Sequence, residues 1–347
     1  EEYVKDRPSG EQFVGLDVSL KSVSICIVDG EGHRIWRGEV ANEACVVAGS
    51  LARHSVSINR IVLETGSCGI HLYRGLSTLG LPVHCICARH AKGVLQCKIN
   101  KSDANDAEGL AQLARTGWYR EVYVKSAEAH VIRTHLLARR QISKARRDFE
   151  NQIRAMLRVF GIKVGTVAKG RFEMRVRRLA AQIPALELPI AQLLMARKSL
   201  ELAQCELEKE ARQLAKSDEQ CQLLQSMPGV GPLTALAFIS AMDGAKRFKK
   251  SASVSAYLGL TPRGHQSGDV AWTGRISKTG DGMARAFLYE AANSLIVRVK
   301  MKSPQKDWPP LKRWAVDLAA RVGGKKARVA LARKMAVILH QMRNRPV

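Results

Sequence analysis

The sequence lacks the segments that mark a membrane-spanning or secreted protein. None of its apolar runs reaches the roughly 20 residues that a membrane-crossing helix needs. The polar, acidic start from Glu1 to Asp6 predicts no secretory leader. The chain also lacks a Cys-x-x-Cys pair, and Cys85-x-Cys87 comes nearest to one. Without a second pair, the eight cysteines are expected to be reduced thiols in a cytoplasmic protein, several of them in its core, and not zinc ligands.

Acidic residues are scarce beside basic ones. The chain holds 31 Asp and Glu against 56 Lys and Arg, a formal net charge of +25. Residues 131–178 carry 14 basic against 3 acidic residues, and residues 271–347 carry 17 against 4. Basic blocks on an otherwise balanced chain indicate nucleic-acid phosphates as the partner. A membrane surface fits less well, because neither block has a clear apolar insertion face beside its charge.

The length and the hydrophobic content predict a globular protein. With 347 residues, 46% of them hydrophobic, the chain is long enough for two or three domains with cores of their own. Its first part predicts strands at 13–18, 22–28 and 34–40, a helix at 41–54, a strand at 58–64, a helix at 70–79 and a strand at 82–88. A helix that opens at Asp103 and a short strand at 121–124 complete it. This order is that of an RNase H-like α/β domain.

Four carboxylates stand at notable places in this domain. Asp103 and Asp106 are three residues apart, so they share a face of the helix that Ser102 would cap. Asp17 lies within the first strand, and Glu64 ends the fourth. Each has a plain alternative: the helix pair favours the positive end of the helix dipole, and the strand acids are satisfied or solvated polar residues. If all four converge on one sheet edge, they would hold one or two Mg²⁺ ions.

Residues 126–222 read as helix. Leucines recur every seven residues, at Leu186, Leu193, Leu200, Leu207 and Leu214. This stripe favours a coiled-coil arm that joins protomers, and the alternative is a helical hairpin within one chain. Five basic side chains of the preceding helix are candidates for phosphate contacts, or else form a solvated basic face: Arg139, Arg140, Lys144, Arg146 and Arg147.

The region 223–300 begins with a turn between helices. Gly229 and Gly231 lie in a Pro-Gly-Val-Gly-Pro turn that resembles a helix-hairpin-helix element, in which backbone N–H groups face a phosphate; a plain turn between helices is the alternative. A Gly- and Ser-rich loop follows, with Ser267 between the basic residues Arg263, Arg275 and Lys278. A hydroxyl near a metal ion becomes a nucleophile, although from composition alone Ser267 is an ordinary turn serine.

The basic tail 301–347 is the least diagnostic region. Its run of Lys325, Lys326 and Arg328 fits a basic element on nucleic acid, with a solvated tail as the alternative. The expected domains are therefore an α/β domain at 10–125, a helical linker at 126–222, a mainly α-helical domain at 223–300 and this helical tail.

Several of these motifs together resemble the DEDD transposases of insertion-sequence family one-hundred-and-ten, also known as bridge-RNA-guided recombinases. The matching pieces follow the family's order over most of residues 13–300: Gly15-Leu16-Asp17, Leu63-Glu64-Thr65-Gly66, Lys101-Ser102-Asp103-Ala104-Asn105-Asp106-Ala107, Pro228-Gly229-Val230-Gly231-Pro232, Gly259-Leu260-Thr261-Pro262-Arg263, Gln266-Ser267-Gly268 and Ile276-Ser277-Lys278-x-Gly280.

The resemblance implies a RuvC-like domain whose metal-binding carboxylates are Asp17, Glu64, Asp103 and Asp106, and a transposase domain whose nucleophile is Ser267. It further implies donor and target DNA, a structured guide RNA, dimers that assemble into a tetramer, and a bacterial protein associated with the nucleoid. The resulting hypothesis is a Mg²⁺-dependent DNA recombinase of an insertion sequence. The alternatives are a RuvC-like junction nuclease that uses water, and a nucleic-acid-binding protein without chemistry.

Overall fold

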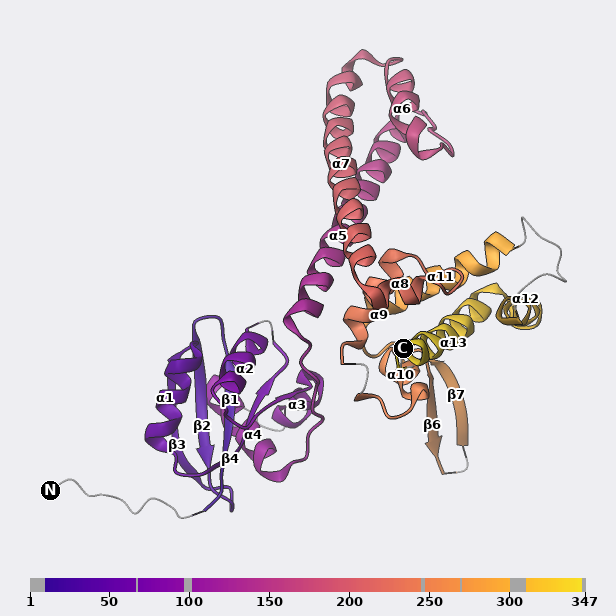
Figure 1. Cartoon of the computed structure of the whole chain (residues 1–347). Coiled ribbons are helices and arrows are strands. Elements are labelled where there is room, and N and C mark those ends of the chain that lie inside the picture. Colours follow the sequence, from indigo (N-terminus) through magenta and orange to yellow (C-terminus); the bar gives the residue numbers. More distant parts are fainter. Residues whose placement is uncertain are drawn as a thin grey trace. The chain divides into compact units, whose positions relative to one another are not determined.

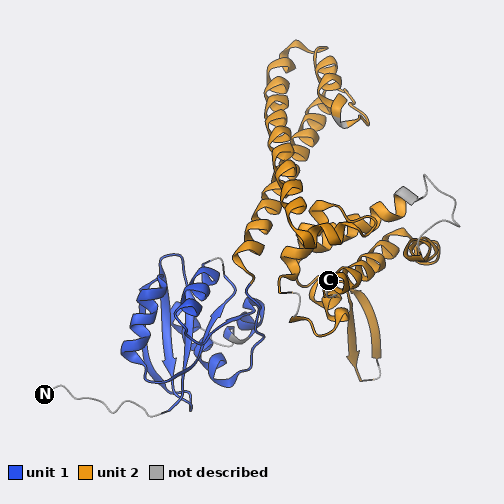
Figure 2. Ribbon diagram, viewed as in Figure 1, with its two compact units in different colours: residues 1–124 blue, residues 125–347 orange. Residues whose placement is uncertain are grey.

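The computed structural model describes residues 10–66, 68–96, 102–244, 247–268, 270–299 and 310–344. It divides into two compact units, residues 1–124 and 125–347 (Figure 2). The domain boundaries expected at 125, 222 and 300 stay predictions. Cys97 and the first residues of the expected tail, 301–309, lie outside the described residues.

Unit 1 is a five-stranded sheet with helices on both faces (Figure 1). The strands run in the order β3-β2-β1-β4-β5; β1 is antiparallel to β2 and parallel to β4. The elements are β1 (Gln12–Val18), β2 (Ser22–Val28), β3 (Arg34–Ala41), α1 (Ala44–His54), β4 (Ile58–Glu64), α2 (Gly69–Thr78), β5 (Val83–Ile86), α3 (Ala88–Leu95) and α4 (Asp103–Thr116). The mixed α/β layout of the sequence prediction is confirmed.

Alternating side chains of the sheet divide the core of unit 1 into two layers. Leu16 and Leu63 lie on the face that α1 and α2 cover, with Val47, Leu51, Leu72 and Leu76. Phe13 and Val62 lie on the opposite face, against Ala91 of α3 and Ala107, Leu110 and Ala111 of α4. This second face carries the acidic residues, because strand side chains alternate with a period of two.

Two sequence predictions for unit 1 need correction. The strand expected at 121–124 is wrong: its only ladder contact among the described residues is a single bridge from Glu121 to Ile86. Because β5 has only four residues, it offers this segment little edge to pair with. The helix α3 was not predicted, because its eight residues include Gly93 and directly follow a strand.

Unit 2 is mostly helical. Its elements are α5 (Ala127–Val159), α6 (Phe172–Ala180), α7 (Glu187–Ser217), α8 (Glu219–Gln225), α9 (Pro232–Met242), α10 (Ser251–Tyr257), β6 (Pro262–Ser267), β7 (Val270–Ile276), α11 (Gly282–Val299), α12 (Pro310–Val322) and α13 (Gly324–Asn344). None of the helices in the described residues is both long and apolar enough to cross a membrane.

The long helices α5 and α7 pack against each other within one chain (Figure 1). Arg197 of α7 is almost fully buried and donates a 2.9 Å hydrogen bond to Glu150 of α5. His135 of α5 lies 2.7 Å from the Leu207 carbonyl. Helix α7 therefore packs against α5 of the same chain, which is the helical hairpin that the sequence left as the alternative. A heptad stripe does not distinguish a partner in the same chain from one in another, and the joining of protomers stays a prediction.

The helical hairpin of α5 and α7 has a separate hydrophobic core at each end. The far end is the one where α5 leads through α6 into α7, and the near end is the one that joins the rest of unit 2. At the far end, Ile153, Phe172, Val176 and Leu194 join α5, α6 and α7 in one cluster. At the near end, Leu136 and Ala211 belong to the larger core formed with α8, α9, α11 and α13. Asp281, at the start of α11, forms ion pairs with Lys125 and with Arg133 of α5.

Candidate active site

The strand register brings Asp17 and Glu64 together. β1 and β4 are parallel neighbours, and Leu16 pairs with Leu63. The next residues, Asp17 and Glu64, therefore stand at the carboxyl ends of strands about 4.8 Å apart. Leu16 and Leu63 share the α1/α2 face, so both acids point to the opposite face. An acid at this position of β1 avoids burial because the strand becomes partly exposed at Asp17.

Helix α4 brings the second pair of acids to the same place. Its N-terminus is capped as predicted: the Ser102 hydroxyl accepts a hydrogen bond from the Asn105 N–H. Asp103 and Asp106 lie in the first turn. The helix packs closely on β1 at Gly15, where a Cβ atom would lie 2.1 Å from the Ala107 carbonyl oxygen. Gly15 thus allows the approach, two residues before Asp17 on the same strand face.

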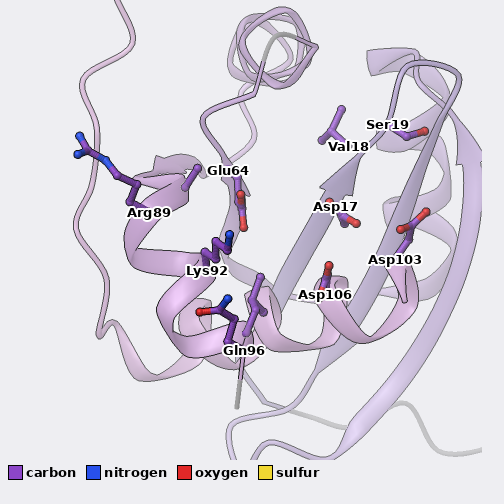
Figure 3. Close-up of a pocket in the computed structure, with 11 residues that line it drawn as sticks. Asp17, Val18, Ser19, Glu64, Arg89, Lys92, Gln96, Asp103 and Asp106 are labelled. Carbon is purple, nitrogen blue, oxygen red and sulfur yellow. The ribbon is translucent and has the colours of Figure 1, made fainter. Parts of the chain in front are cut away.

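The four carboxylates line one pocket of about 820 Å³ (Figure 3). The pocket is widely open to solvent, and its acidic residues come from β1, β4 and the first turn of α4. Cys85 of β5 lies in the core layer on the opposite face of the sheet. Burial, together with the negative charges of Glu121 and Glu64, raises the pKa of its thiol to about 12. The predicted set of acids is thus assembled at one sheet edge.

Helix α3 contributes basic and polar side chains to the same pocket: Arg89, Lys92 and Gln96, the last just after the helix end. In Figure 3 the Lys92 side chain extends toward the Glu64 side of the pocket, and the Arg89 guanidinium points away from the acids. Within the described residues the Lys92 amine has no ion-pair partner. Sequence reasoning missed these residues; the available signal was the i, i+3 spacing of Arg89 and Lys92 directly after a strand.

The donor chemistry of the pocket fits a hard divalent cation. All four candidate ligands offer carboxylate oxygens, which suit Mg²⁺ better than a soft metal. Among the described residues no three His, Cys, Asp or Glu side chains are already drawn together into a metal cluster. Mg²⁺ does not require such a cluster, because it commonly binds through one or two carboxylates and keeps water and substrate phosphate as its other ligands. The open pocket leaves room for both.

Ser267 belongs to unit 2, on an element that the sequence did not predict. The expected Gly- and Ser-rich loop is a β-hairpin in which β6 and β7 are antiparallel. Ser267 is the last residue of β6, pairs with Val270, and is followed by Gly268 with a φ of +55°. Its side chain is exposed and has no hydrogen-bond partner within the described residues. The hairpin was missed because both its faces are exposed, so that it lacks an apolar alternation.

The predicted phosphate-binding residues of α5 fall into two groups. Arg139 pairs with Glu208 of α7, and Arg146 pairs with Glu150. Arg140, Lys144 and Arg147 are exposed, and their spacing places them on one face of the helix. The exposed group is accessible to a phosphate, whereas the paired group is already bound to carboxylates. Phosphate binding by all five residues stays a prediction.

The glycine turn at Gly229 and Gly231 does join two helices, α8 and α9, as predicted. Gly229 lies against α11, where a Cβ atom would be 2.8 Å from the Ala291 carbonyl oxygen, so its packing alone accounts for a glycine. Phosphate binding by this turn stays a prediction.

The other predicted phosphate contacts of unit 2 are on exposed surfaces. Arg263, Arg275 and Lys278 are exposed on or beside the hairpin. Lys325 and Lys326 are exposed in the first turn of α13, and Arg328 is half-buried there.

The cysteines in the described part of the chain differ in their exposure, and their redox state stays a prediction. Cys26, Cys85 and Cys221 are buried, Cys68 and Cys87 partly buried, and Cys45 and Cys205 exposed.

A mixed α/β fold with four acids in one pocket is what a DEDD-type domain would have, and comparisons with known proteins show that type. Residues 14–161 match the IS110-type DEDD transposase domain, which implies an RNase H-like fold. Residues 221–308 match the Transposase IS116/IS110/IS902 family. The chain belongs to this family of insertion-sequence transposases.

Two relatives extend over nearly the whole chain. The transposase for insertion sequence element IS1111A of Coxiella burnetii is 31% identical over 332 residues, which are 94% of this chain and 88% of that protein. A protein of Pseudomonas aeruginosa described as a probable family 20 transposase is 30% identical over 339 residues, 96% of each chain. The similarity therefore includes both units, and DNA cutting and rejoining is the activity that the family supports.

Proposed function

We propose that this transposase cuts and rejoins DNA strands with the Ser267 hydroxyl as nucleophile. Asp17, Glu64, Asp103 and Asp106 would hold Mg²⁺. The observation that carries the proposal is the pocket in which these four carboxylates meet. An acidic pocket repels phosphodiesters unless a cation is bound there, and the family is one that acts on DNA. The exposed hydroxyl of Ser267 gives a second, separate support.

The reaction balances as two transesterifications. The Ser267 oxygen forms a bond to phosphorus while the bond from phosphorus to the 3′ oxygen breaks. The serine proton passes to solvent, and the 3′ oxygen takes up a proton to become a hydroxyl. A 3′ hydroxyl of an exchanged strand then attacks the phosphoserine and restores Ser267. Bound Mg²⁺ would supply charge stabilisation for the phosphorane-like transition state.

Lys92 has a part of its own in this proposal. Its amine lines the acidic pocket without an ion-pair partner among the described residues, so a non-bridging phosphate oxygen can take that position. The positive charge of Lys92 would position the scissile phosphate and leave all four carboxylates available to the metal ion. Removing one such contact with Lys92→Ala would slow the reaction by roughly 10- to 100-fold.

The proposal includes a structured RNA that guides the protein to donor and target DNA, and dimers that assemble into a tetramer. The two basic blocks, residues 131–178 and 271–347, support the binding of a second nucleic acid. Their positive charge is larger than contacts to the DNA at the acidic pocket alone would use. The element's own non-coding flanks test the RNA: if they are deleted and supplied on a second transcript, recombination should return. Full activity without either flank would contradict this part. Mass photometry of the RNA-bound protein checks the tetramer.

The experiment for the nucleophile compares Ser267→Ala with Ser277→Ala in a plasmid that carries the whole insertion sequence and its flanks. Ser277 lies just beyond β7, where its hydroxyl pairs with that of Thr279, so it is a matched serine away from the hairpin tip. We expect Ser267→Ala to abolish strand exchange and to leave no protein–DNA adduct on a denaturing gel. Ser277→Ala should retain both. Normal joining by Ser267→Ala would overturn the proposal.

Two other functions predict different results in the same experiment. A junction nuclease that activates water needs the carboxylates and not Ser267, so it would cut DNA without an adduct. A binding protein without chemistry would show no cutting, and Asp103→Asn would leave its function intact. The adduct thus separates the serine mechanism from both alternatives.

A further inference from the structure

The hairpin of β6 and β7 carries an exposed aromatic pair beside Ser267. All six residues of β6 and the first four of β7 are exposed. His265 and Trp272 face each other across the two strands. Their rings are stacked, with centroids 5.5 Å apart and planes 14° from parallel. Trp272 nevertheless keeps 55% of its surface exposed.

The Trp272 ring is held in place from a second direction. It lies against Gly274 on the same strand, where a Cβ atom would come within 2.6 Å of the ring. A glycine therefore leaves the room that the indole occupies, and His265 limits its rotation from the facing strand. The ring is thus positioned before any partner binds, which lowers the entropy cost of stacking a further ring on it.

The aromatic pair and Ser267 lie on the same face of the hairpin. Side chains of a strand alternate, so His265 and Ser267, which lie in the regular part of the ladder, share one face of β6. His265 and Ser267 are two residues apart along a regular strand, a distance of about 7 Å. This is on the order of one nucleotide of extended single strand, whose bases can stack on protein aromatics while the backbone follows a basic groove.

The charge around the pair suits a phosphodiester backbone. Arg263, Arg275 and Lys278 are the cations of residues 262–278, against one acid in the sequence, Asp269. The guanidinium of Arg263 donates a 2.9 Å hydrogen bond to the Ser277 carbonyl, which holds it at the end of the hairpin away from the turn. An anionic, aromatic ligand meets both features at once.

We propose that the His265–Trp272 stack is a platform for an unpaired nucleobase of the DNA strand, next to the phosphate that Ser267 attacks. This inference rests on the proposed role of Ser267. Trp272 is then a positioning residue: a base stacked on it fixes the adjoining phosphate about one nucleotide away. A base inside a duplex is covered on both faces by its neighbours, so the platform takes a base that is unstacked or single-stranded.

The test measures how the full-length protein binds a short fluorescent single-stranded oligonucleotide, and the same strand with one abasic position. Salt is raised until phosphate contacts contribute little. One base stacked on an aromatic ring contributes about 1–3 kcal/mol, so Trp272→Ala should weaken binding about 5- to 150-fold, and Trp272→Phe should restore most of it. The wild type should bind the abasic strand more weakly than the intact strand. Trp272→Ala should bind the two strands with equal affinity.

A matched control is the exposed tryptophan of unit 1, Trp118, which is 71% exposed and meets His90 edge to face at 6.0 Å. Trp118→Ala should leave binding unchanged. A cross-strand pair also stabilises a hairpin by roughly 0.2–1 kcal/mol, so Trp272→Ala could weaken binding by destabilising the hairpin. Trp272→Phe, which keeps an aromatic ring, and the abasic strand, which leaves the protein unchanged, distinguish that effect from the loss of base stacking. Gly274→Ala, which displaces the ring without removing it, should give an intermediate loss.

The outcomes distinguish this inference from the role of Ser267. Equal affinity of the wild type and Trp272→Ala for the intact strand would overturn the platform, even if a Ser267 adduct forms. Suppose that no Ser267 adduct forms, but that Trp272→Ala and the abasic position lower the affinity by the same factor. The platform is then supported and the role of Ser267 as nucleophile is contradicted. Ser267→Ala should bind the oligonucleotide as the wild type does, because it leaves the stack intact.

Discussion

The two units present their reactive groups in opposite ways. The acids of unit 1 are fixed by strand register and by a helix packed onto a glycine, so their backbone positions are as rigid as a core allows. Ser267 of unit 2 is at the tip of an exposed two-stranded ribbon with little core beneath it. The comparison suggests that the backbone positions of the carboxylates, the proposed metal ligands, are preorganised, whereas Ser267, the proposed nucleophile, would be placed by what it binds.

The largest effect should come from the rigid side of this comparison. Asp103→Asn or Asp17→Asn removes a carboxylate from the pocket, and we expect a loss of strand exchange of about 1,000-fold, equivalent to about 4 kcal/mol. Glu31→Gln, in the exposed turn between β2 and β3, should retain activity.

A second measurement for these variants does not depend on catalysis. Added Mg²⁺ should raise the thermal unfolding midpoint of the wild type and raise that of Asp103→Asn less, because a cation that binds the folded state stabilises it. Equal shifts in the two proteins would show that Asp103 does not hold the metal.

Gly15→Ala tests whether close packing positions the acids. The added methyl group would lie 2.1 Å from the Ala107 carbonyl oxygen, so α4 must move away from β1. We expect a loss of about 3 kcal/mol in the free energy of unfolding of unit 1, at the upper end of overpacking, with reduced Mg²⁺ affinity. Denaturant unfolding measures the first and calorimetry the second.

The matched control is Gly49→Ala on the exposed face of α1, where nothing lies within 4 Å of the new atom. Alanine in a helix should stabilise by about 0.5–1 kcal/mol. If both variants were equally stable, the close approach at Gly15 would not matter.

Unit 2 has a buried carboxylate, Asp281, that forms ion pairs within the protein, and its protonation at low pH should destabilise this unit. Burial favours a raised pKa for Asp281, but the Ala284 N–H and the charges of Arg133 and Lys125 outweigh it, and the pKa is lowered. A lowered pKa in the folded state means stability that is present above about pH 4 and is lost as the pH falls further. We therefore expect unit 2 to unfold in acid, with α5 released from α11.

Asp281→Asn should lower the free energy of unfolding by about 3 kcal/mol at neutral pH, because it removes the carboxylate that pairs with two partly buried cations, Lys125 and Arg133. The difference from wild type should shrink as the pH falls below about 4. Asp148→Asn, exposed on α5, is the control and should change little. A constant difference at all pH values would contradict the ion-pair explanation.

The smallest expected effect sharpens the contrast with unit 1. Ser267→Ala should change the free energy of unfolding by less than about 0.5 kcal/mol, because the side chain is exposed and unpartnered among the described residues. A loss of activity at unchanged stability, checked by denaturant unfolding, separates a chemical role for Ser267 from a structural one.

The sequence was most informative where side chains are half-buried. An acid in an apolar strand and a strand that ends on Glu64 predicted the sheet edge, and β2 and β4 have the predicted bounds. The helix α3 and the hairpin were missed, because a short helix with a glycine and a ribbon exposed on both faces lack hydrophobic periodicity. Lys92 was therefore missed as well, although it lies in the same pocket as Glu64.

The most direct test of the division between carboxylates and nucleophile is the identity of the residue that carries the DNA. Trypsin would release Gly264–Arg275, in which Ser267 is the only serine. After reaction with the plasmid-borne element and nuclease digestion, mass spectrometry should find a nucleotide on Ser267 in the wild type and none in Asp103→Asn. A nucleotide on another residue, or cleaved DNA without any modified peptide, would contradict the account.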